Sequence, residues 1–463
     1  MKTILISVML FLLAFPAAAQ WIKQNVDTTA SLRGLSVVNE KVVWASGTGG
    51  TVIRTIDGGK TWNVMIVPDA EKLDFRDVEA FDANTAYILS IGNGESSRIY
   101  KTTDGGSTWK ELFRNKNEKA FYDAIACWDR ENCVAMSDPV DGRFVGRFIE
   151  STVRRTVDMD LGKWPDAKPG EAAFAASGTC LIAGGKQKAI FVSGGTDARV
   201  FVADLSTLSK DFQMKWQVSS TPIIRGTSSS GIFSIAMFDR SNGVIVGGNY
   251  EKPHEAKDNL AFTTDGGMTW KLGTGLSGYR SGVTYVDRRT IVAVGTNGSD
   301  VSGDGGRTWR NLDRVNYNAV QAAGSKSVWA VGPNGNISRL DITEPTPGFV
   351  KALRNRHHPV NVNNVRLSHS EIRTDCPPKS SECSSSRFVS VDASVAAFDE
   401  DVYDMVYTVS AGHIIGKGHS VQWDLTNVPA GKYLITTAAK EPTFDGRTWM
   451  VIGKTVTNLV EIK

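Results

Sequence analysis

One eight-residue string occurs four times in the chain, and it constrains the fold more than any other feature. It reads TIDGGKTW at residues 55–62, TTDGGSTW at 102–109, TTDGGMTW at 263–270 and SGDGGRTW at 302–309. A phosphate-binding P-loop requires a glycine five positions before Gly59, and Arg54 occupies that position. Lys60 is also replaced by serine, methionine and arginine in the other copies. We therefore interpret the string as a structural turn.

The residue types of this turn predict a tight hairpin. The aspartate can accept hydrogen bonds from nearby backbone N–H groups, and the glycine pair supplies positive φ angles. The threonine and tryptophan begin the next strand, and the indole is expected to wedge between neighbouring units with its N–H group hydrogen-bonded. These structural roles are predicted for Asp57, Trp62, Asp104, Trp109, Asp265, Trp270, Asp304 and Trp309.

Short apolar strands recur with the turns. Aligned on the strand that precedes each turn, seven copies are anchored at Trp44, Tyr87, Val134, Ile190, Val244, Ile291 and Val328. The seventh copy lacks its last strand, and Trp21 stands where such a strand is expected, so the N-terminal strand is predicted to complete the seventh sheet. This pattern predicts an all-β fold, a seven-bladed β-propeller over residues 20–342 with about 46 residues per blade.

The sequence patterns at the two ends of the chain differ from those of the repeats. Residues 1–19 combine Lys2, an apolar run and Ala17 to Ala19, which is typical of a signal peptide cleaved near Ala19. We therefore expect a secreted or periplasmic protein, without a later membrane span. Residues 343–359 are predicted to be a linker. Residues 360–463 contain short strands separated by turn signals, which favours a small immunoglobulin-like β-sandwich.

Charge and cysteine content indicate which class of ligand and which cellular compartment to expect. The formal net charge is +3 and both signs are interspersed, so the sequence gives no electrostatic case for nucleic acid. Disulfides Cys127–Cys133 and Cys376–Cys383 are expected in an oxidising compartment, with Cys180 as a buried free thiol. A reactive Cys180 is the alternative, although no histidine lies near it in the sequence.

The turn resembles the Asp-box of BNR repeats, which occur in sialidases and in many propellers without enzymatic activity. The strings SDPVDGRF, GEAAFAASGTC and SDVSGDGGRTW resemble a family of exported bacterial propellers labelled BNR or YVTN-like. That family is similar to the photosystem II assembly-factor propellers. The resemblance covers about 320 residues and implies a fold rather than an activity. The segment YTVSAGHIIGKGHSVQWDL resembles PKD or Ig-like modules.

The inner strand of each propeller blade opens at the central channel, so the residues that lead into these strands are the candidate site. Candidate ligand-binding residues are Arg33, Arg76, Asp77, Tyr122, Asp123, Glu171, Tyr279, Arg280 and Tyr317. Arginines could bind a carboxylate or phosphate, and the balanced charge favours a peptide. The resemblance to sialidases implies an alternative, a glycoside hydrolase with catalytic Tyr122, Asp123 and Glu171 acting on an anionic sugar. The simplest interpretation is that these charges pair with one another.

Other chemistry has little support in the sequence. The propeller region contains one histidine, His254, and no zinc or Ser-His-Asp motif, so we expect no metal and no cofactor. The pair His357 and His358 is interpreted as part of a solvated linker, and the acidic stretch at 398–404 as a solvated turn with weak calcium binding as its alternative. The insertion GNYEKPHEAKDN at 248–259 is a candidate partner contact. We expect a monomer whose partner is a protein, a peptide or an anionic glycan.

Overall fold

The computed structural model describes residues 20–152, 156–160, 164–184, 188–204, 215–341, 361–373, 376, 383–396, 404–442, 449–451 and 455–463. The signal peptide, the linker with His357 and His358, and residues 398–403 of the acidic stretch lie outside these ranges. Within them the regular structure is β-strand, together with the 3-10 turn η1 (Gly94–Ser96). The predicted all-β class is therefore confirmed.

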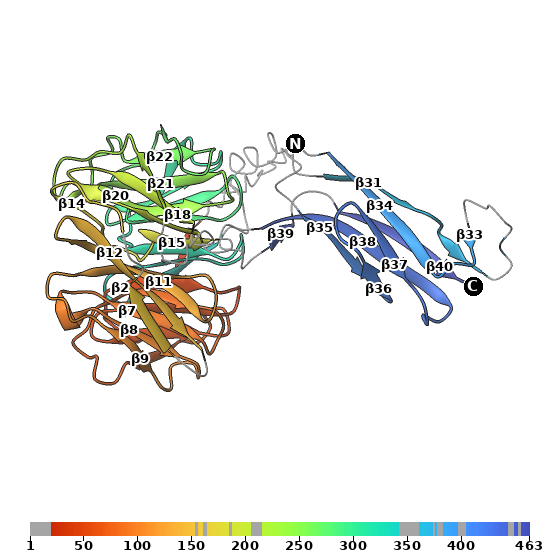
Figure 1. Ribbon diagram of the computed structural model, residues 1–463, viewed down its shortest axis with the longest axis horizontal. Helices are drawn as coiled ribbons and strands as arrows, with labels where there is room; N and C mark the ends of the chain where they lie inside the picture. Colours follow the sequence, from red (N-terminus) through yellow and green to blue (C-terminus); the bar gives the residue numbers. More distant parts are fainter. Residues whose placement is uncertain are drawn as a thin grey trace, which may run out of the picture.

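In the described part of residues 20–341, the strands form seven antiparallel sheets, numbered here in chain order (Figure 1). Sheet 1 consists of β2 (Leu32–Val37), β3 (Val43–Gly47), β4 (Thr51–Thr55) and β5 (Asn63–Ile66). Sheet 2 consists of β6 (Phe75–Ala80), β7 (Ala86–Ser90), β8 (Arg98–Thr102) and β9 (Lys110–Arg114). Sheet 3 consists of β10 (Tyr122–Cys127), β11 (Asn132–Val140), β12 (Arg143–Ser151) and β13 (Thr156–Asp160). Sheet 4 consists of β15 (Leu181–Gly184), β16 (Lys188–Val192), β18 (Arg199–Asp204) and β19 (Trp216–Ser220).

Sheets 5 to 7 complete the set. Sheet 5 consists of β20 (Ser230–Met237), β21 (Gly243–Asn249), β22 (Leu260–Thr263) and β23 (Lys271–Leu272), extended by β14 (Glu171–Ala172) and β17 (Gly194–Gly195). Sheet 6 consists of β24 (Gly282–Tyr285), β25 (Ile291–Gly295), β26 (Gly298–Ser302) and β27 (Trp309–Asp313). Sheet 7 consists of β28 (Ala319–Ala322), β29 (Val328–Val331) and β30 (Ile337–Asp341) with β1 (Gln20–Lys23).

The sheets are arranged in a closed circle. The first strand of each sheet, β2, β6, β10, β15, β20, β24 and β28 in turn, contacts the first strand of the next, and β28 contacts β2. Apolar side chains from facing sheets form the cores between them. The N-terminal strand β1 pairs with β30, with Trp21 opposite Leu340, as the sequence predicts. This arrangement is a β-propeller, in which the first strands line the axis.

The four Asp-box turns share one hydrogen-bond pattern. In the first, the Asp57 carboxylate accepts the backbone N–H of Thr61 at 2.9 Å and the Thr61 hydroxyl at 2.6 Å. Gly58 and Gly59 have φ angles of 75° and 89°. These hydrogen bonds lower the pKa of Asp57 to about 2. The predicted structural turn is confirmed in all four copies.

The Asp-box tryptophans pack against the preceding sheet, as predicted. Trp62 lies 5.6 Å from Trp329 of sheet 7, and Trp109 lies 6.5 Å from Trp44 of sheet 1. The expected hydrogen bond of the indole N–H is present in two of the four copies. The N–H groups of Trp270 and Trp309 donate to carbonyls of their own turns, whereas those of Trp62 and Trp109 are buried without an acceptor.

The Asp57→Ala variant should lower the melting temperature by a few degrees, because the three hydrogen bonds that the carboxylate accepts from Thr55 and Thr61 are lost. Thermal denaturation compares it with Lys60→Ala, an exposed change in the same turn. Ligand affinity should be unchanged in both. Loss of ligand binding in a folded Asp57→Ala protein would instead assign the turn a direct role in recognition.

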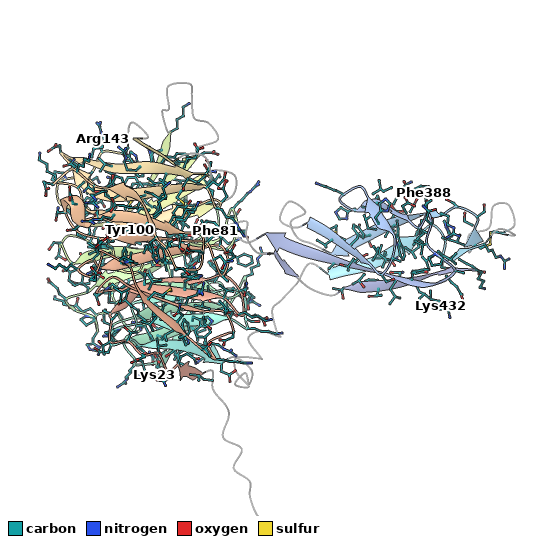
Figure 2. The ribbon with its side chains drawn as sticks, turned by 90° about the horizontal axis from the view of Figure 1, so that it is seen from below. Lys23, Phe81, Tyr100, Arg143, Phe388 and Lys432 are labelled. Carbon is teal, nitrogen blue, oxygen red and sulfur yellow. A yellow bond between two sulfur atoms is a disulfide. The ribbon has the colours of Figure 1, made fainter. Side chains whose placement is uncertain are left out.

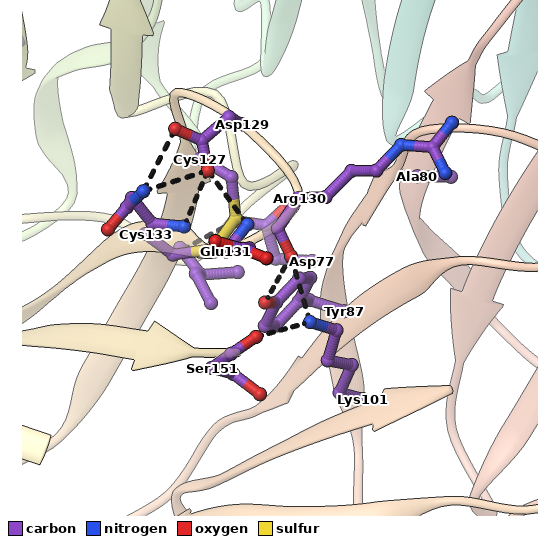
Figure 3. The surroundings of a disulfide bond; sticks show 12 residues. Asp77, Ala80, Tyr87, Lys101, Cys127, Asp129, Arg130, Glu131, Cys133 and Ser151 are labelled. Carbon is purple, nitrogen blue, oxygen red and sulfur yellow. Dashed lines mark hydrogen bonds between the residues drawn. A yellow bond between two sulfur atoms is a disulfide. The ribbon is translucent and has the colours of Figure 1, made fainter. Parts of the chain in front are cut away.

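Both predicted disulfides are present, and Cys180 is buried as a free thiol. Cys127 and Cys133 are register partners on β10 and β11, so their bond closes the turn between these strands (Figure 3). The carbonyl of Arg130 in that turn accepts hydrogen bonds from the Tyr87 hydroxyl and the Lys101 ammonium, each at 2.8 Å. Sheets 2 and 3 are thereby tied together at the closed turn.

The second folded unit spans the described part of residues 361–463, drawn in blue in Figure 1. Two sheets face each other across an apolar core that includes Val391, Trp423 and Ile435. One sheet contains β31 (Asn361–Leu367), β34 (Phe388–Ala396), β37 (Ser420–Asp424) and β36 (His413–Ile415). The other contains β33 (Cys383–Ser384), β32 (Glu371–Ile372), β40 (Val456–Ile462), β38 (Gly431–Pro442) and β35 (Asp404–Val409), with β39 (Trp449–Val451) beside β38. Phe388, labelled in Figure 2, is 44% exposed on this unit.

Candidate functional site

Two of the predicted arginines meet at one end of the axis. Arg33 on β2 and Arg76 on β6 belong to neighbouring sheets, and each guanidinium donates a hydrogen bond to the same short stretch of chain. Burial lowers the pKa of Arg33, and the neighbouring positive charge of Arg76 acts in the same direction. Arg76 also pairs with Asp74 at 2.8 Å. The site therefore holds two guanidinium groups and the carboxylate of Asp74.

The stretch that these arginines contact is residues 173–179, here named the crossing segment. It follows β14 and precedes β15, and it contacts residues of sheets 1, 2, 3 and 5. Arg33 of sheet 1 donates to the Ala176 carbonyl at 3.1 Å, and Arg76 of sheet 2 donates to the Ala175 carbonyl at 3.2 Å. On the far side, the Ser177 hydroxyl donates to the carbonyl of Ser281, just before sheet 6, at 2.7 Å. The crossing segment therefore passes across the axis.

Three aspartates lie beneath the crossing segment. Asp77 is 5% exposed and accepts the backbone N–H of Ile125 at 2.8 Å, which links the first strands of sheets 2 and 3. Asp123 is 1% exposed, and Asp138 accepts the backbone N–H of Ala173 at 2.8 Å. Burial raises the pKa of all three carboxyl groups, that of Asp138 to about 6, and the Asp138 charge also raises the pKa of Asp123.

An aromatic cluster completes this end of the axis. Phe174 of the crossing segment is stacked on Phe233 with ring centroids 3.9 Å apart and an interplanar angle of 5°. The predicted candidate Tyr279 packs edge-on against Phe233 and is 4% exposed. The sheet 5 insertion contributes Tyr250, which packs edge-on against Phe174 and Phe233 and is 46% exposed. Tyr250 is thus the ring through which the cluster is exposed to solvent.

Other predicted site residues do not converge here. Arg280 is fully buried in an ion pair with Asp300 inside sheet 6, with a nitrogen–oxygen distance of 2.6 Å. Tyr317 is 1% exposed and packs against Trp21 in the core between sheets 6 and 7. The prediction that both line the channel is wrong. Both residues lie just before the first strand of their sheet, and their side chains face the interior of sheet 6 and the core between sheets 6 and 7.

The alternative catalytic set is also dispersed. Tyr122 is 4% exposed and packs against Phe113, whereas its neighbour Asp123 is 1% exposed and lies beneath the crossing segment. The prediction that Glu171 leads into the first strand of sheet 4 is wrong. Glu171 lies on β14 and forms a buried ion pair with Arg199. These side chains do not share an open pocket, so the geometry does not support a glycosidase centre of this composition.

The sequence contains a signal for the crossing segment that our prediction missed. Arg33 precedes the anchor Trp44 by 11 residues, whereas Glu171 precedes the anchor Ile190 by 19. The extra residues are those that run from β14 across the axis to β15. The spacing alone indicates an insertion, but it does not say where the insertion lies.

A pocket of about 650 Å³ lies beside the start of the crossing segment. Its lining includes Asn93, Lys119, Phe121, Asp138, Lys168 and Glu171. The side chains described here contain no cluster of three or more potential metal ligands. No helix in the described ranges has the length and apolar character to span a lipid bilayer.

The buried aspartates predict a pH dependence of stability. In an unfolded chain Asp ionises near pH 4, whereas folded Asp138 retains its proton up to about pH 6. Folding therefore takes up a proton between these values, and stability should fall as the pH rises through this window, by roughly 1–2 kcal/mol for Asp138. Asp77 and Asp123 act in the same direction.

The Asp138→Asn variant should show a smaller decline, because its side chain does not titrate and its amide oxygen can still accept from Ala173. Urea denaturation at pH 4.5 and pH 7.5 measures the difference. Parallel declines in the wild type and the variant would contradict proton uptake by Asp138. The Asp-box carboxylates act at lower pH, since the lowered pKa values of Asp57 and Asp104, about 2 each, make their stabilisation decline below about pH 4.

Comparison with known proteins supports the fold at the N-terminal end. The family model described as "Photosynthesis system II assembly factor YCF48" matches residues 14–126. No curated protein matches the chain. Similar solved structures include YCF48 bound to D1 peptide, at 17% identity over 70% of this chain and 99% of that chain, with a TM-score of 0.49.

Two further structures have the same relation to this chain. YCF48 from Cyanidioschyzon merolae is 18% identical over 70% of this chain and 99% of that chain, with a TM-score of 0.46. The WD40 propeller domain of Doa1 is 9% identical over 71% of this chain and 98% of that chain, with a TM-score of 0.49. The chain is thus a β-propeller whose N-terminal region, residues 14–126, is similar to the family of the photosystem II assembly factor YCF48.

Proposed function

We propose that this protein is an exported binding protein that recognises an extended peptide segment of a partner protein at the end of the propeller axis where Arg33 and Arg76 meet. The observation that carries this proposal is that both arginines already donate hydrogen bonds to peptide carbonyls, those of Ala176 and Ala175. A guanidinium has five N–H donors, so each arginine retains donors for a second acceptor. Tyr250 adds an exposed aromatic surface beside them.

The proposal also assigns the blades, the linker and the C-terminal domain. The seven sheets are the blades of a seven-bladed propeller that ends near residue 342, residues 343–359 are a linker, and residues 360–463 form an immunoglobulin-like or PKD-like sandwich. The facing sheets and the shared core of the second unit support this assignment. Residues 1–19 act as the export signal. We assign the sandwich the role of a spacer or a second binding surface.

A peptide display selection against the full mature chain tests the function. Selected peptides are synthesised, and their affinities are measured by calorimetry for the wild type, Arg33→Ala and Arg76→Ala. Each arginine variant should bind about 5- to 100-fold more weakly, as expected for losing a charged hydrogen bond of about 1–3 kcal/mol. Arg76→Lys separates charge from geometry, because lysine keeps the charge and loses the planar fork.

Lys60→Ala is the matched control, since it removes one positive charge from an Asp-box turn outside the site. Its affinity for the selected peptides should equal that of the wild type. Thermal denaturation confirms that each variant is folded. Equal affinities in all variants, or the recovery of no peptide, would contradict peptide recognition at this site.

A further inference from the structure

The crossing segment is held as a bound peptide would be held. Its backbone groups contact side chains of three sheets: the Ala173 N–H donates to Asp138, and the Ala175 and Ala176 carbonyls accept from Arg76 and Arg33. Residues 173–179 belong to no strand of the described sheets. The main chain of the segment is therefore bound largely through side-chain donors and acceptors, which is a common way to recognise an extended ligand.

The side chains of the segment fit particular positions. Phe174 is stacked on Phe233, and the Ser177 hydroxyl donates to the Ser281 carbonyl at 2.7 Å. Between these anchors, Ala175 and Ala176 are 8% and 7% exposed, so larger side chains have little room there. The site thus selects an aromatic residue followed by small residues and a hydroxyl-bearing residue.

The two ends of the segment are anchored independently of this site. Glu171 forms a buried ion pair with Arg199, and the Cys180 carbonyl accepts the backbone N–H of Val192 at 2.9 Å. Gly178 has a φ of 77°, and a Cβ at this position would lie 2.2 Å from the Asp77 carboxylate. The Thr179 carbonyl also accepts the backbone N–H of Ile235 on β20 at 3.0 Å. Residues 173–177 can therefore leave the axis while these anchors remain in place, with Gly178 as one flexible point.

We propose that the crossing segment is an internal competitor for the axial site, and that the partner supplies a peptide of the same class, aromatic–small–small–hydroxyl, which displaces it. This inference rests on the proposed function and specifies the ligand. The apparent affinity for such a peptide is reduced by the fraction of molecules in which the segment occupies the site. A change that weakens the segment's own binding must then strengthen peptide binding.

The stacked pair Phe174 and Phe233 allows a test that distinguishes the competing ring from the ring that receives it. The probe is a fluorescent synthetic peptide with the sequence of residues 171–179, EAAFAASGT, titrated into the full mature chain and followed by fluorescence anisotropy. Phe174→Ala removes the competitor's anchor, so peptide affinity should rise about tenfold, the scale of one lost aromatic contact. Phe233→Ala removes a ring that the segment and the peptide both use, so the two losses offset each other and peptide affinity should stay close to that of the wild type.

Two controls keep the test decisive. Ser177→Ala is a milder way to weaken the segment, because it removes the hydrogen bond to the Ser281 carbonyl, and it should raise peptide affinity by a smaller factor. A peptide with alanine in place of its phenylalanine should not bind any variant. Near-ultraviolet circular dichroism establishes that each variant is folded.

The outcomes separate this inference from the proposed function. If folded Phe174→Ala and Ser177→Ala bind the probe no better than the wild type, the crossing segment is a permanent part of the core and the inference is overturned. Display-selected peptides that still depend on Arg33 and Arg76 would then bind above the segment, and the proposed function would stand. If, in addition, the binding of display-selected peptides does not depend on Arg33 and Arg76, both proposals are overturned.

Discussion

The Arg280→Ala variant is expected to lose about 3–5 kcal/mol of unfolding free energy, the scale of breaking a buried ion pair by removing one partner. Arg280 and Asp300 are both fully buried. The guanidinium also donates to the Tyr279 carbonyl and the Asn297 side chain, each at 2.6 Å. Alanine would leave the Asp300 charge without its cation and a cavity beside it.

Chemical denaturation of three proteins tests this prediction. Arg280→Ala should be strongly destabilised, whereas a double variant with Arg280→Met and Asp300→Leu should recover most of the lost free energy, because no unpaired charge remains. Arg76→Ala is the comparison at the axis, where the side chain is partly exposed and the loss should be smaller. An Arg280→Ala protein as stable as the wild type would show that the pair contributes nothing to folding.

Deletion of residues 20–26 should have the other large effect. The deletion removes β1, exposes β30 as an unpaired edge and removes side-chain contacts between sheets 7 and 6. It also removes Trp21, whose ring lies 5.2 Å from Tyr317 and whose indole N–H donates to the Ser299 hydroxyl at 2.9 Å. Truncating one core tryptophan costs about 3–5 kcal/mol, so the deletion should lower the melting temperature sharply and promote aggregation.

Adding the missing strand in trans provides the control. A synthetic peptide with the sequence of residues 20–26 should bind the truncated protein and raise its melting temperature, because its backbone can pair with β30 again. A scrambled peptide of the same composition should have no effect. A truncated protein that melts at the wild-type temperature would contradict closure of the ring by the N-terminal strand.

The sequence predicted the elements whose information is local and repeated. Each Asp-box contains its own acceptor, its glycines and its threonine donor within eight residues, so the turn at Asp57 can be predicted without any distant contact. The alternation of apolar residues likewise indicates the second strand of each sheet. Pairing of β1 with β30 joins the two ends of the ring, yet it was predictable because one copy of a repeat lacked a strand and the other end of the chain supplied one.

The sequence did not predict which way the candidate side chains point. A register shift lies between residues 122 and 124, Tyr122 packs against Phe113, and Tyr317 faces sheet 6. Such shifts leave little trace in an apolar pattern, because a strand with one extra residue has similar composition. The arginines were correctly placed at the starts of first strands, but only the structure shows whether each faces the axis or a core.

By itself, therefore, the sequence determined the all-β class, the repeated turns, the closing strand and the two disulfides, because each follows from residues close together or from a repeat. The tertiary structure alone decided what occupies the axis. The contacts of the crossing segment join residues far apart in the chain, such as Arg33 and the carbonyl of Ala176. Backbone carbonyls are identical in every residue, so no side-chain pattern records which of them an arginine will bind.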